Sequence, residues 1–540
     1  MFSQRTKHSF EILTICLYAS LLSVVSYFHE PWFDEAQAWL IARDSSLFDM
    51  IWNVLRYEGH TPLWYLSLFI PAHMGIPFEL GLKSINFVFA VLAAATFIKY
   101  APFPLVVRIL TPFTYFLFYQ YGVISRCYSL FMLILWLIAA VFPRRNERPL
   151  LFSVLLALLG GITAYGMLIA FGIALAWLIE ITIKYRKNAP SFFRALANTV
   201  SDKRFHSLIL LGVLNVFYVA ILWPMPDRHT PQYFDHITAG EILYRFISVP
   251  VGSLFWGENP EAFSNSDASA YSIYIAVIGL CLIAILFIWA VRNKIFNYVF
   301  FPYVILNLFI SFIYFSPHHS GLYTLLTIFL VWITEQKRDE FKPPQRANKI
   351  NNNFYKNRKY KLPYKEMFIT CLAFFFIIQI YWSFSASMND MRYPYSPYRD
   401  LALFVKNNKL SGENIFDYYY VYNGINSYYT KNNAMLAYFP DNIFYNHNFG
   451  RRSIGYATHR KMDDNTLMEY LKSAGLPDFI LWNNRPLPFY HDFFSLSDYV
   501  PIKSFIGYYM WKDLLAPESV VCYIRKDLLE QYTNLSIQPD

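Results

Sequence analysis

The chain has 540 residues, of which 56% are hydrophobic and only 15% are charged. Soluble globular domains carry roughly 25% charged residues, so the composition excludes an ordinary soluble enzyme and favours an integral membrane protein. The formal net charge of +9 is concentrated in a few loops, which indicates orientation in a bilayer rather than nucleic-acid binding. The five cysteines show neither metal-ligand spacing nor a disulfide framework.

Apolar runs recur along the first 385 residues, and a helix needs about 20 apolar residues to cross a bilayer. The first run lacks a small-residue cleavage site, so we expect it to remain as an anchor. A shorter run at 62–74 predicts an interfacial or re-entrant helix. In chain order, the sequence predicts about eleven spans, at residues 9–28, 82–100, 103–123, 127–142, 150–165, 166–183, 207–224, 271–291, 296–316, 318–334 and 367–385.

Lysine and arginine cluster after the fourth, sixth and eighth runs, and most densely in the segment 335–366. If the spans alternate, all of these loops lie on one side, which the positive-inside rule makes cytoplasmic. We therefore expect a multi-pass protein of the inner (plasma) membrane with a cytoplasmic N-terminus. Residues 29–81, 225–270 and 386–540 are then outside.

The last segment, 386–540, is polar and rich in tyrosine and asparagine. Its patterns predict an amphipathic helix at 398–408, a strand at 415–422, a capped helix at 463–472 and a further strand in DFILWNN. The predicted fold class is a polytopic α-helical membrane protein with a small C-terminal α/β domain. We expect a transmembrane catalytic domain at 1–385 and an extracytoplasmic domain of about 150 residues behind it.

Polar residues gather on the expected outer side, beginning with the adjacent acids Asp34 and Glu35 just after the first run. Acids in a first helical turn favour its dipole, so capping is one explanation, but it accounts for only one of them. His60 lies in RYEGHTPLWY and is either a general base, a metal ligand, a phosphate contact or an ordinary loop histidine. Arg126 lies between the third and fourth runs, where an arginine is costly unless it is hydrated or paired; the alternative is snorkelling to the interface.

Two later clusters have open interpretations. His318 and His319 lie in SPHHSG at the outer end of the ninth run. One interpretation is that they bind phosphate or a metal ion, and the other is that they cap the loop. The loop sequence PDRHTPQYFDH allows metal ligation, although a solvated polar loop is the favoured interpretation. Its titratable residues are Asp227, Arg228, His229, Asp235 and His236.

The order of these motifs resembles the GT-C superfamily of membrane glycosyltransferases, which use lipid-phosphate sugars as donors. The lipopolysaccharide glycosyltransferases of the Rgt type would be the nearest relatives, with protein O-mannosyltransferases and aminoarabinose transferases of lipid A more distant. Asp34 and Glu35 match the first-loop acid motif. The run that begins at His60 matches the HPPL-Y pattern with threonine in place of one proline, and Arg126 with Tyr128 matches the S-R-x-x-Y element.

This resemblance implies an inverting glycosyltransferase that moves a sugar from a polyprenyl-phosphate carrier to an acceptor glycan, lipid or protein on the outer face. Asp34 is the implied base for the acceptor hydroxyl, and Arg126 is expected to stabilise the leaving phosphate. Glu35 is expected to take part in catalysis, either by positioning Asp34 or by holding a divalent ion, alone or with His60. The remaining donor-phosphate contacts are expected to be His60, Tyr128, His318 and His319.

Three alternatives remain beside this interpretation. A polysaccharide polymerase or ligase usually relies on arginine-rich outer loops, whereas the largest basic cluster here is expected to be cytoplasmic. A transporter typically has repeated halves and ionisable groups in mid-span, and the sequence has no obvious half repeat. The third alternative, a non-catalytic protein of the same fold, stays open.

The match to the GT-C pattern is imperfect at 316–321, because many GT-C enzymes carry an arginine–tyrosine pair in that region.

Overall fold

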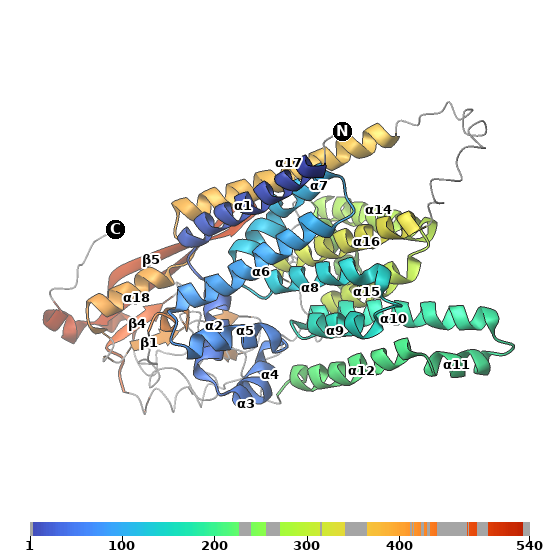
Figure 1. The fold of residues 1–540 in the computed structure, drawn as a ribbon. Helices are drawn as coiled ribbons and strands as arrows, with labels where there is room; N and C mark the ends of the chain where they lie inside the picture. Colours follow the sequence, from blue (N-terminus) through green and yellow to red (C-terminus); the bar gives the residue numbers. More distant parts are fainter. Residues whose placement is uncertain are drawn as a thin grey trace.

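The computed structural model of the chain is mostly helical (Figure 1). The long helices run side by side, and a small sheet lies beyond one end of them. The structure describes residues 4–225, 239–254, 270–313, 316–340, 364–410, 413, 415–418, 420–422, 426–428, 433–439, 472, 475–482 and 495–532.

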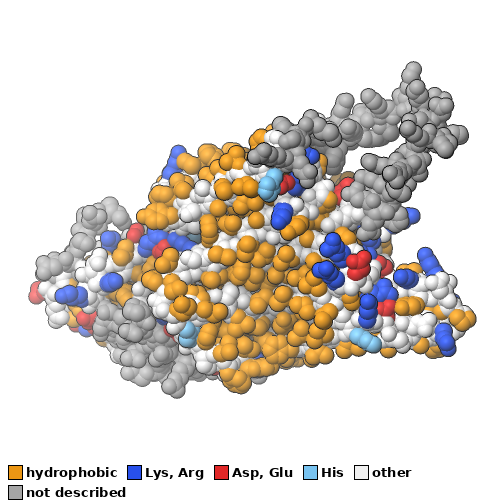
Figure 2. All heavy atoms as spheres, in the orientation of Figure 1, with side chains coloured by type: hydrophobic (Ala, Val, Ile, Leu, Met, Phe, Trp, Pro, Cys, Tyr) orange, Lys and Arg blue, Asp and Glu red, His pale blue; other side chains and the backbone are white. Residues whose placement is uncertain are grey.

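Within the described residues, six helices are long and apolar enough to cross a membrane, judged by their length and composition. This agrees with the predicted membrane protein, but the count of eleven spans is not confirmed. The six are α1 (Gln4–Phe28), α6 (Phe78–Tyr100), α10 (Ala164–Asn188), α12 (Lys203–Leu222), α14 (Ala270–Arg292) and α17 (Tyr364–Arg392). Figure 2 shows hydrophobic side chains over the middle of this helical part and charged ones mainly toward its ends.

The other predicted spans correspond to shorter or interrupted helices. The run 103–123 is not one helix, because prolines at 104 and 112 lack the amide hydrogen that continues a helical ladder. It forms α7 (Leu105–Leu110), the 3-10 turn η2 (Thr111–Phe113) and the π-helix η3 (Phe116–Val123). The remaining predicted spans form α8 (Tyr128–Val141), α9 (Pro149–Gly160), α15 (Phe296–Phe312) and α16 (Gly321–Glu340).

The first predicted outer loop folds into a chain of short helices against the bundle. The predicted helix at 62–74 is present as α5 (Leu63–His73). Its start is tied to the α9–α10 turn, because the Leu63 amide donates to the Gly161 carbonyl at 2.8 Å and the buried Thr61 hydroxyl donates to the Gly160 carbonyl at 2.9 Å. The other pieces are α2 (Phe33–Asp44), α3 (Leu47–Asp49), η1 (Met50–Val54) and α4 (Leu55–Glu58).

Several short elements connect the bundle. They are η4 (Phe142–Arg144), α11 (Phe192–Val200), α13 (Ala239–Ser248), η5 (Val249–Ser253) and η7 (Pro317–Ser320). The cluster from Asp227 to His236 and most of the basic segment 335–366 lie outside the described residues. Their predicted roles therefore stay predictions.

The predicted C-terminal α/β domain is present. Its main sheet has the order β1-β4-β6-β5, in which β1 pairs with β4 in parallel and the other pairs are antiparallel. The predicted helix at 398–408 and the predicted strand in DFILWNN are confirmed, whereas the single strand predicted at 415–422 forms two short strands that belong to different sheets. The helix predicted at 463–472 falls almost wholly outside the described residues. The elements are α18 (Tyr398–Asn407), β1 (Ile415–Tyr418), β2 (Tyr420–Tyr422), β3 (Asn426–Tyr428), α19 (Asn433–Leu436), β4 (Phe479–Trp482), η11 (Leu496–Asp498), β5 (Tyr499–Trp511), β6 (Leu514–Arg525) and η12 (Lys526–Tyr532).

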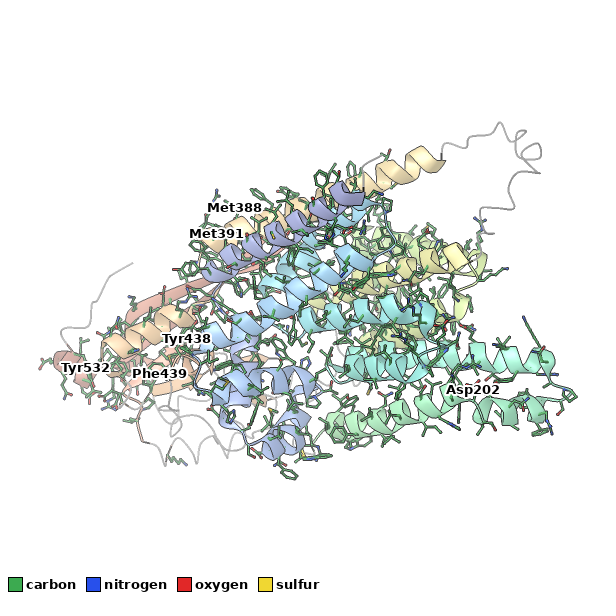
Figure 3. All side chains as sticks on the ribbon, viewed as in Figure 1. Asp202, Met388, Met391, Tyr438, Phe439 and Tyr532 are labelled. Atoms are coloured by element: carbon green, nitrogen blue, oxygen red, sulfur yellow. The ribbon has the colours of Figure 1, made fainter. Side chains whose placement is uncertain are left out.

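Polar contacts join this domain to the first half of the chain. Arg399 of α18 forms ion pairs with Glu79 of α6 at 2.7 Å and with Glu30 at 3.1 Å. Tyr438 and Phe439, labelled in Figure 3, lie at the same junction. The Tyr438 hydroxyl donates to Glu79 at 2.9 Å, and the Phe439 carbonyl accepts from the Arg43 guanidinium of α2 at 2.6 Å.

The tip of the β5–β6 hairpin inserts into the helical part. Lys512, in the turn between the strands, is buried, and its amide donates to the Tyr115 hydroxyl at 2.9 Å. Its ammonium donates to the Gly252 carbonyl at 3.1 Å and lies 4.4 Å from the centre of the Trp382 ring. The sheet domain and the helices are therefore joined through a buried contact as well as through partly buried ion pairs.

Candidate functional site

The central contact of the candidate site joins Asp34 to Arg126. Asp34 lies in the first turn of α2, and Arg126 lies in the turn between η3 and α8. Their side chains form an ion pair at 3.0 Å, with Asp34 28% exposed and Arg126 14% exposed. Arg126 is therefore paired rather than only snorkelling, and Asp34 keeps part of its surface open to an incoming group.

Arg126 also contacts the histidine pair on the far side of the site. Its guanidinium donates to His318 Nε2 at 2.9 Å and lies 5.6 Å from the centre of the Tyr128 ring. Because His318 Nε2 accepts this bond, its Nδ1 carries the hydrogen and donates to the Ser316 hydroxyl at 3.0 Å. Burial, followed by the nearby charges of His319, Arg126 and His60, lowers the pKa of His318 well below its usual value. His318 is thus a neutral acceptor that orients the guanidinium.

His319 lies beside His318, with 4.2 Å between the ring centres. Its Nδ1 accepts from the Ser316 amide at 2.9 Å and from the Tyr165 hydroxyl at 3.3 Å. Burial, with smaller contributions from Arg126 and His60, lowers the pKa of His319 well below its usual value. Tyr165, in the first turn of α10, is a site residue that the sequence analysis missed, because nothing in its neighbourhood distinguishes it from other tyrosines at helix starts.

His60 lies at the edge of this cluster, just before α5. Its ring centre is 6.3 Å from that of Tyr65, and its charge acts on both His318 and His319. The structure thus brings five predicted site residues into a connected set of contacts and places His60 beside them. The five are Asp34, Arg126, Tyr128, His318 and His319.

The site lies where several helices begin. Asp34, Tyr128 and Tyr165 stand in the first turns of α2, α8 and α10, and the histidine pair directly precedes α16. A helix N-terminus carries a partial positive charge and favours anions. Together with the Arg126 guanidinium, this arrangement suits an anionic group such as a phosphate.

Glu35 does not share this environment, although it is adjacent to Asp34. Its side chain is fully buried, and one oxygen accepts from the Trp32 amide at 2.9 Å and contacts His29 Nε2 at 3.0 Å. The other oxygen accepts from the Ser125 amide at 2.5 Å. Both oxygens are thus engaged within the protein, so these contacts do not fit a metal ligand and instead fit a group that positions the start of α2 and the turn carrying Arg126.

His29 continues this buried network toward the end of α17. Its Nδ1 contacts Asp390 at 2.8 Å, and the Tyr119 hydroxyl donates to the same carboxylate oxygen at 3.0 Å. Burial alone would lower the pKa of His29, but the carboxylates of Asp390 and Glu35 outweigh burial and raise the pKa to about 10. His29 is therefore protonated at neutral pH and bridges two buried carboxylates.

Candidate metal ligands are not grouped together in the part of the chain that the structure describes. No set of three or more His, Cys, Asp or Glu side chains is arranged there to hold an ion. The predicted pair of Glu35 and His60 does not fit such a site, since Glu35 is engaged as described above.

Comparisons of the chain with protein-family models, with curated proteins and with solved structures return no match. The resemblance to GT-C enzymes therefore depends on the motifs alone. What the site does has to be argued from its contacts.

Proposed function

We propose that this chain is an inverting glycosyltransferase that transfers a sugar from a polyprenyl-phosphate carrier to an acceptor on the outer face of the membrane. The observation that carries the proposal is the partly exposed Asp34–Arg126 ion pair, held on its far side by His318. A carboxylate next to a phosphate-binding cation is the pair of groups that this reaction requires. The acceptor is a glycan, a lipid or a protein.

In the proposed reaction the acceptor hydroxyl oxygen attacks the anomeric carbon of the sugar. Asp34 takes the hydroxyl proton as the new carbon–oxygen bond forms. The bond between the anomeric carbon and the phosphate oxygen breaks, its electron pair stays on that oxygen, and Arg126 stabilises the growing charge. Displacement from the side opposite the phosphate inverts the anomeric centre. Tyr128, His318 and His319 support the guanidinium, and His60 is expected to contact the phosphate from the edge of the site.

The ion pair suggests how donor binding prepares the base. Without a donor, Arg126 neutralises Asp34 at 3.0 Å. A donor phosphate competes for the guanidinium, since arginine matches the geometry of phosphate oxygens. Asp34 then loses its partner and becomes available to accept the proton. The base is thus released from its ion pair only when the sugar donor is in place.

The position of the site along the helices supports the proposed orientation. Tyr165, at the site, and Lys184, in the basic last part of α10, are 19 positions apart on one helix. At 1.5 Å per residue this is about 28 Å, close to the thickness of the hydrocarbon core. With the basic end in the cytoplasm, the site opens outward and the C-terminal domain lies on the outer side of the inner membrane.

The test separates donor binding from transfer. Asp34→Asn should reduce transfer of labelled sugar by about 10²-fold or more, because an amide cannot take the proton. The same variant should bind polyprenyl phosphate at least as well as wild type, because the amide no longer competes for Arg126. Arg126→Ala should lose both donor binding and transfer. The assay uses purified protein, a panel of polyprenyl-phosphate sugars labelled in the sugar, and lipid and glycan acceptors.

Asp49→Asn is the matched control, since Asp49 lies in the same outer segment and bonds locally to Asn53 and Ser46. It should behave as wild type. Wild-type transfer by Asp34→Asn would overturn the assignment of the base. A wild-type protein that binds no polyprenyl phosphate would instead favour a non-catalytic protein of this fold.

A further inference from the structure

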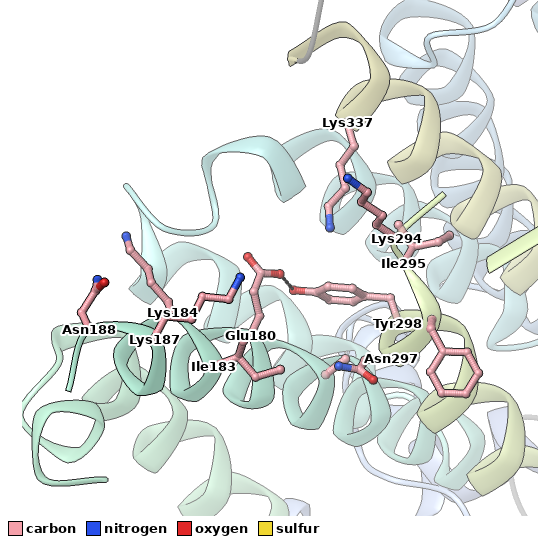
Figure 4. Close-up of a pocket in the computed structure, with 12 residues that line it drawn as sticks. Glu180, Ile183, Lys184, Lys187, Asn188, Lys294, Ile295, Asn297, Tyr298 and Lys337 are labelled. Carbon is pink, nitrogen blue, oxygen red and sulfur yellow. Dashed lines mark hydrogen bonds between the residues drawn. The ribbon is translucent and has the colours of Figure 1, made fainter. Parts of the chain in front are cut away.

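A second polar pocket lies at the opposite end of the helices. It has a volume of about 500 Å³ and opens between the last turns of α10, the α14–α15 turn and α16. Figure 4 shows lysine side chains from these elements around the opening. Its charged lining residues are Glu180, Lys184, Lys187, Lys294 and Lys337.

The lining is strongly basic. It contains four lysines and one glutamate, for a formal charge of +3. The glutamate, Glu180, is already engaged by the Arg145 guanidinium at 2.6 Å and by the Tyr298 hydroxyl at 2.7 Å. Its charge is therefore largely balanced from outside the pocket, and the lysines present a positive surface to whatever enters.

Lys294 holds an unfavourable backbone conformation at this pocket. Its φ of 57° lies in the left-handed region, where glycine is usual because a side chain is crowded there. The position follows α14 in a Schellman motif, with the Ile295 amide donating to the Ala290 carbonyl at 3.0 Å and the Lys294 amide to the Val291 carbonyl at 3.1 Å. Glycine suits this turn better than lysine, so replacing Lys294 with glycine would remove the side chain from the pocket without straining the turn.

Apolar side chains flank the lysines. Ile183 and Phe296 line the pocket and are 47% and 40% exposed on its surface. A free phosphate gains nothing from such groups, whereas a lipid places its acyl chains beside them and its phosphate among the lysines. Basic pockets between membrane helices on the cytoplasmic side are a known form of lipid-headgroup site.

We propose that this pocket binds the phosphate of an anionic lipid headgroup from the inner leaflet. The choice of leaflet rests on the orientation in the proposed function, whereas binding itself needs no transfer activity. The lysines contact the phosphate, and the apolar residues lie against the acyl chains. The site lies about 28 Å along α10 from Tyr165 and is distinct from the candidate active site.

The test measures the melting temperature and the lipid retained in native mass spectrometry of the full chain in detergent. The added compounds are phosphatidylglycerol, phosphatidylcholine and inorganic phosphate. Phosphatidylglycerol should raise the melting temperature and stay bound, while the other two should do neither. An equal response to phosphatidylcholine would overturn the proposal of an anionic site, and a response to inorganic phosphate alone would show a soluble-anion site instead.

Lys294→Gly provides a variant whose stability and binding should change in opposite directions. It removes the side chain and relieves the backbone, so the lipid-free protein should melt at a higher temperature. Its affinity for phosphatidylglycerol should fall roughly fivefold, the usual effect of one basic residue near an anionic lipid surface. Lys184→Gln with Lys187→Gln should reduce the affinity by about 25-fold.

Lys203→Gln is the control, because Lys203 is an exposed lysine that begins α12 and does not line the pocket. Its affinity should match wild type. Equal loss in the control and the pocket variants would mean that general basic charge binds the lipid, and unchanged affinity in the pocket variants would place the lipid elsewhere. Both results would overturn the proposal. Neither depends on sugar transfer, so failure here is distinct from failure of the proposed function.

Discussion

Replacing His29 with glutamine should remove a large and pH-dependent part of the stability. The His29 ring lies between Asp390 at 2.8 Å and Glu35 at 3.0 Å, and all three side chains are fully buried. Glutamine keeps a hydrogen-bond donor but not the positive charge. Removing one partner of a buried ion pair costs about 3–5 kcal/mol, because the carboxylates left behind lose their counter-ion.

The raised pKa of His29 sets the pH range of this effect. A pKa of about 10 in the folded protein against 6.5 in the unfolded chain corresponds to about 5 kcal/mol. Because the folded value is the higher one, the stabilisation is complete below pH 6.5 and is lost as the pH rises through 10. Linkage gives about 4 kcal/mol at pH 7 and about 1 kcal/mol at pH 9.

The measurement is the melting temperature of wild type and His29→Gln between pH 6.5 and 9.5, followed by tryptophan fluorescence in detergent. Only the difference between the two proteins is diagnostic, because burial lowers the pKa of Lys512 to about 7 and the resulting cost to folding shrinks as the pH rises. The difference should be large at pH 7 and shrink by more than half at pH 9. His73→Gln, at an exposed histidine that ends α5, should match wild type throughout. A difference that stays constant with pH would show that His29 is not the charged partner.

Two further predictions concern packing and orientation. Gly172→Ala should destabilise the protein by about 1–3 kcal/mol, because the new Cβ would lie 2.6 Å from the Pro302 backbone of α15. Gly212→Ala is the control, since no atom lies within 4 Å of its Cβ, and it should leave the stability unchanged or raise it by up to about 1 kcal/mol. Equal melting temperatures of the two variants would contradict the close α10–α15 packing. In a background with the five native cysteines replaced, Ser497→Cys should react with an impermeant maleimide in intact spheroplasts, while Ser201→Cys should react only after permeabilisation. The reverse pattern would overturn the proposed orientation.

Sequence reasoning predicted the parts of this protein that depend on composition and on short patterns. The long apolar runs predicted a membrane-type helical protein, and the change to polar sequence after residue 385 predicted the separate sheet domain. Both properties follow from local free energies of transfer, so they can be inferred without knowledge of which helices touch. The number of spans was less certain, because prolines interrupt runs whose average hydrophobicity is high enough.

The candidate site was predicted in part. The motif order indicated that Asp34 and Arg126 belong together, and their ion pair agrees with that. It did not predict that Glu35 is fully buried while Asp34 stays partly exposed, because neighbouring residues on a helix point in different directions and only the packing decides which one is buried. His29, which contacts Glu35, also contacts Asp390. His29 and Asp390 are 361 positions apart, and no local pattern predicts such a contact.

The β5–β6 hairpin was missed for a similar reason. Its residues do not alternate cleanly, since the pairing has an irregularity between Pro501 and Lys503 and prolines weaken a strand pattern. Gly507 has no side chain where the chain passes close to Pro397, and a Cβ there would lie 2.7 Å from it. The strand is defined by this close docking more than by its own sequence.

The buried tip of that hairpin has a consequence for how the protein is made. Lys512 packs among Tyr115, Gly252 and Trp382, and it is translated 397 positions after Tyr115. At about 5–20 residues per second the ribosome needs roughly 20–80 s to cover that distance. The helices around Tyr115 and Trp382 therefore lack this packing until the hairpin turn has been synthesised. A prematurely terminated product lacks the piece that closes them, so a cell's proteases can distinguish it from the finished protein.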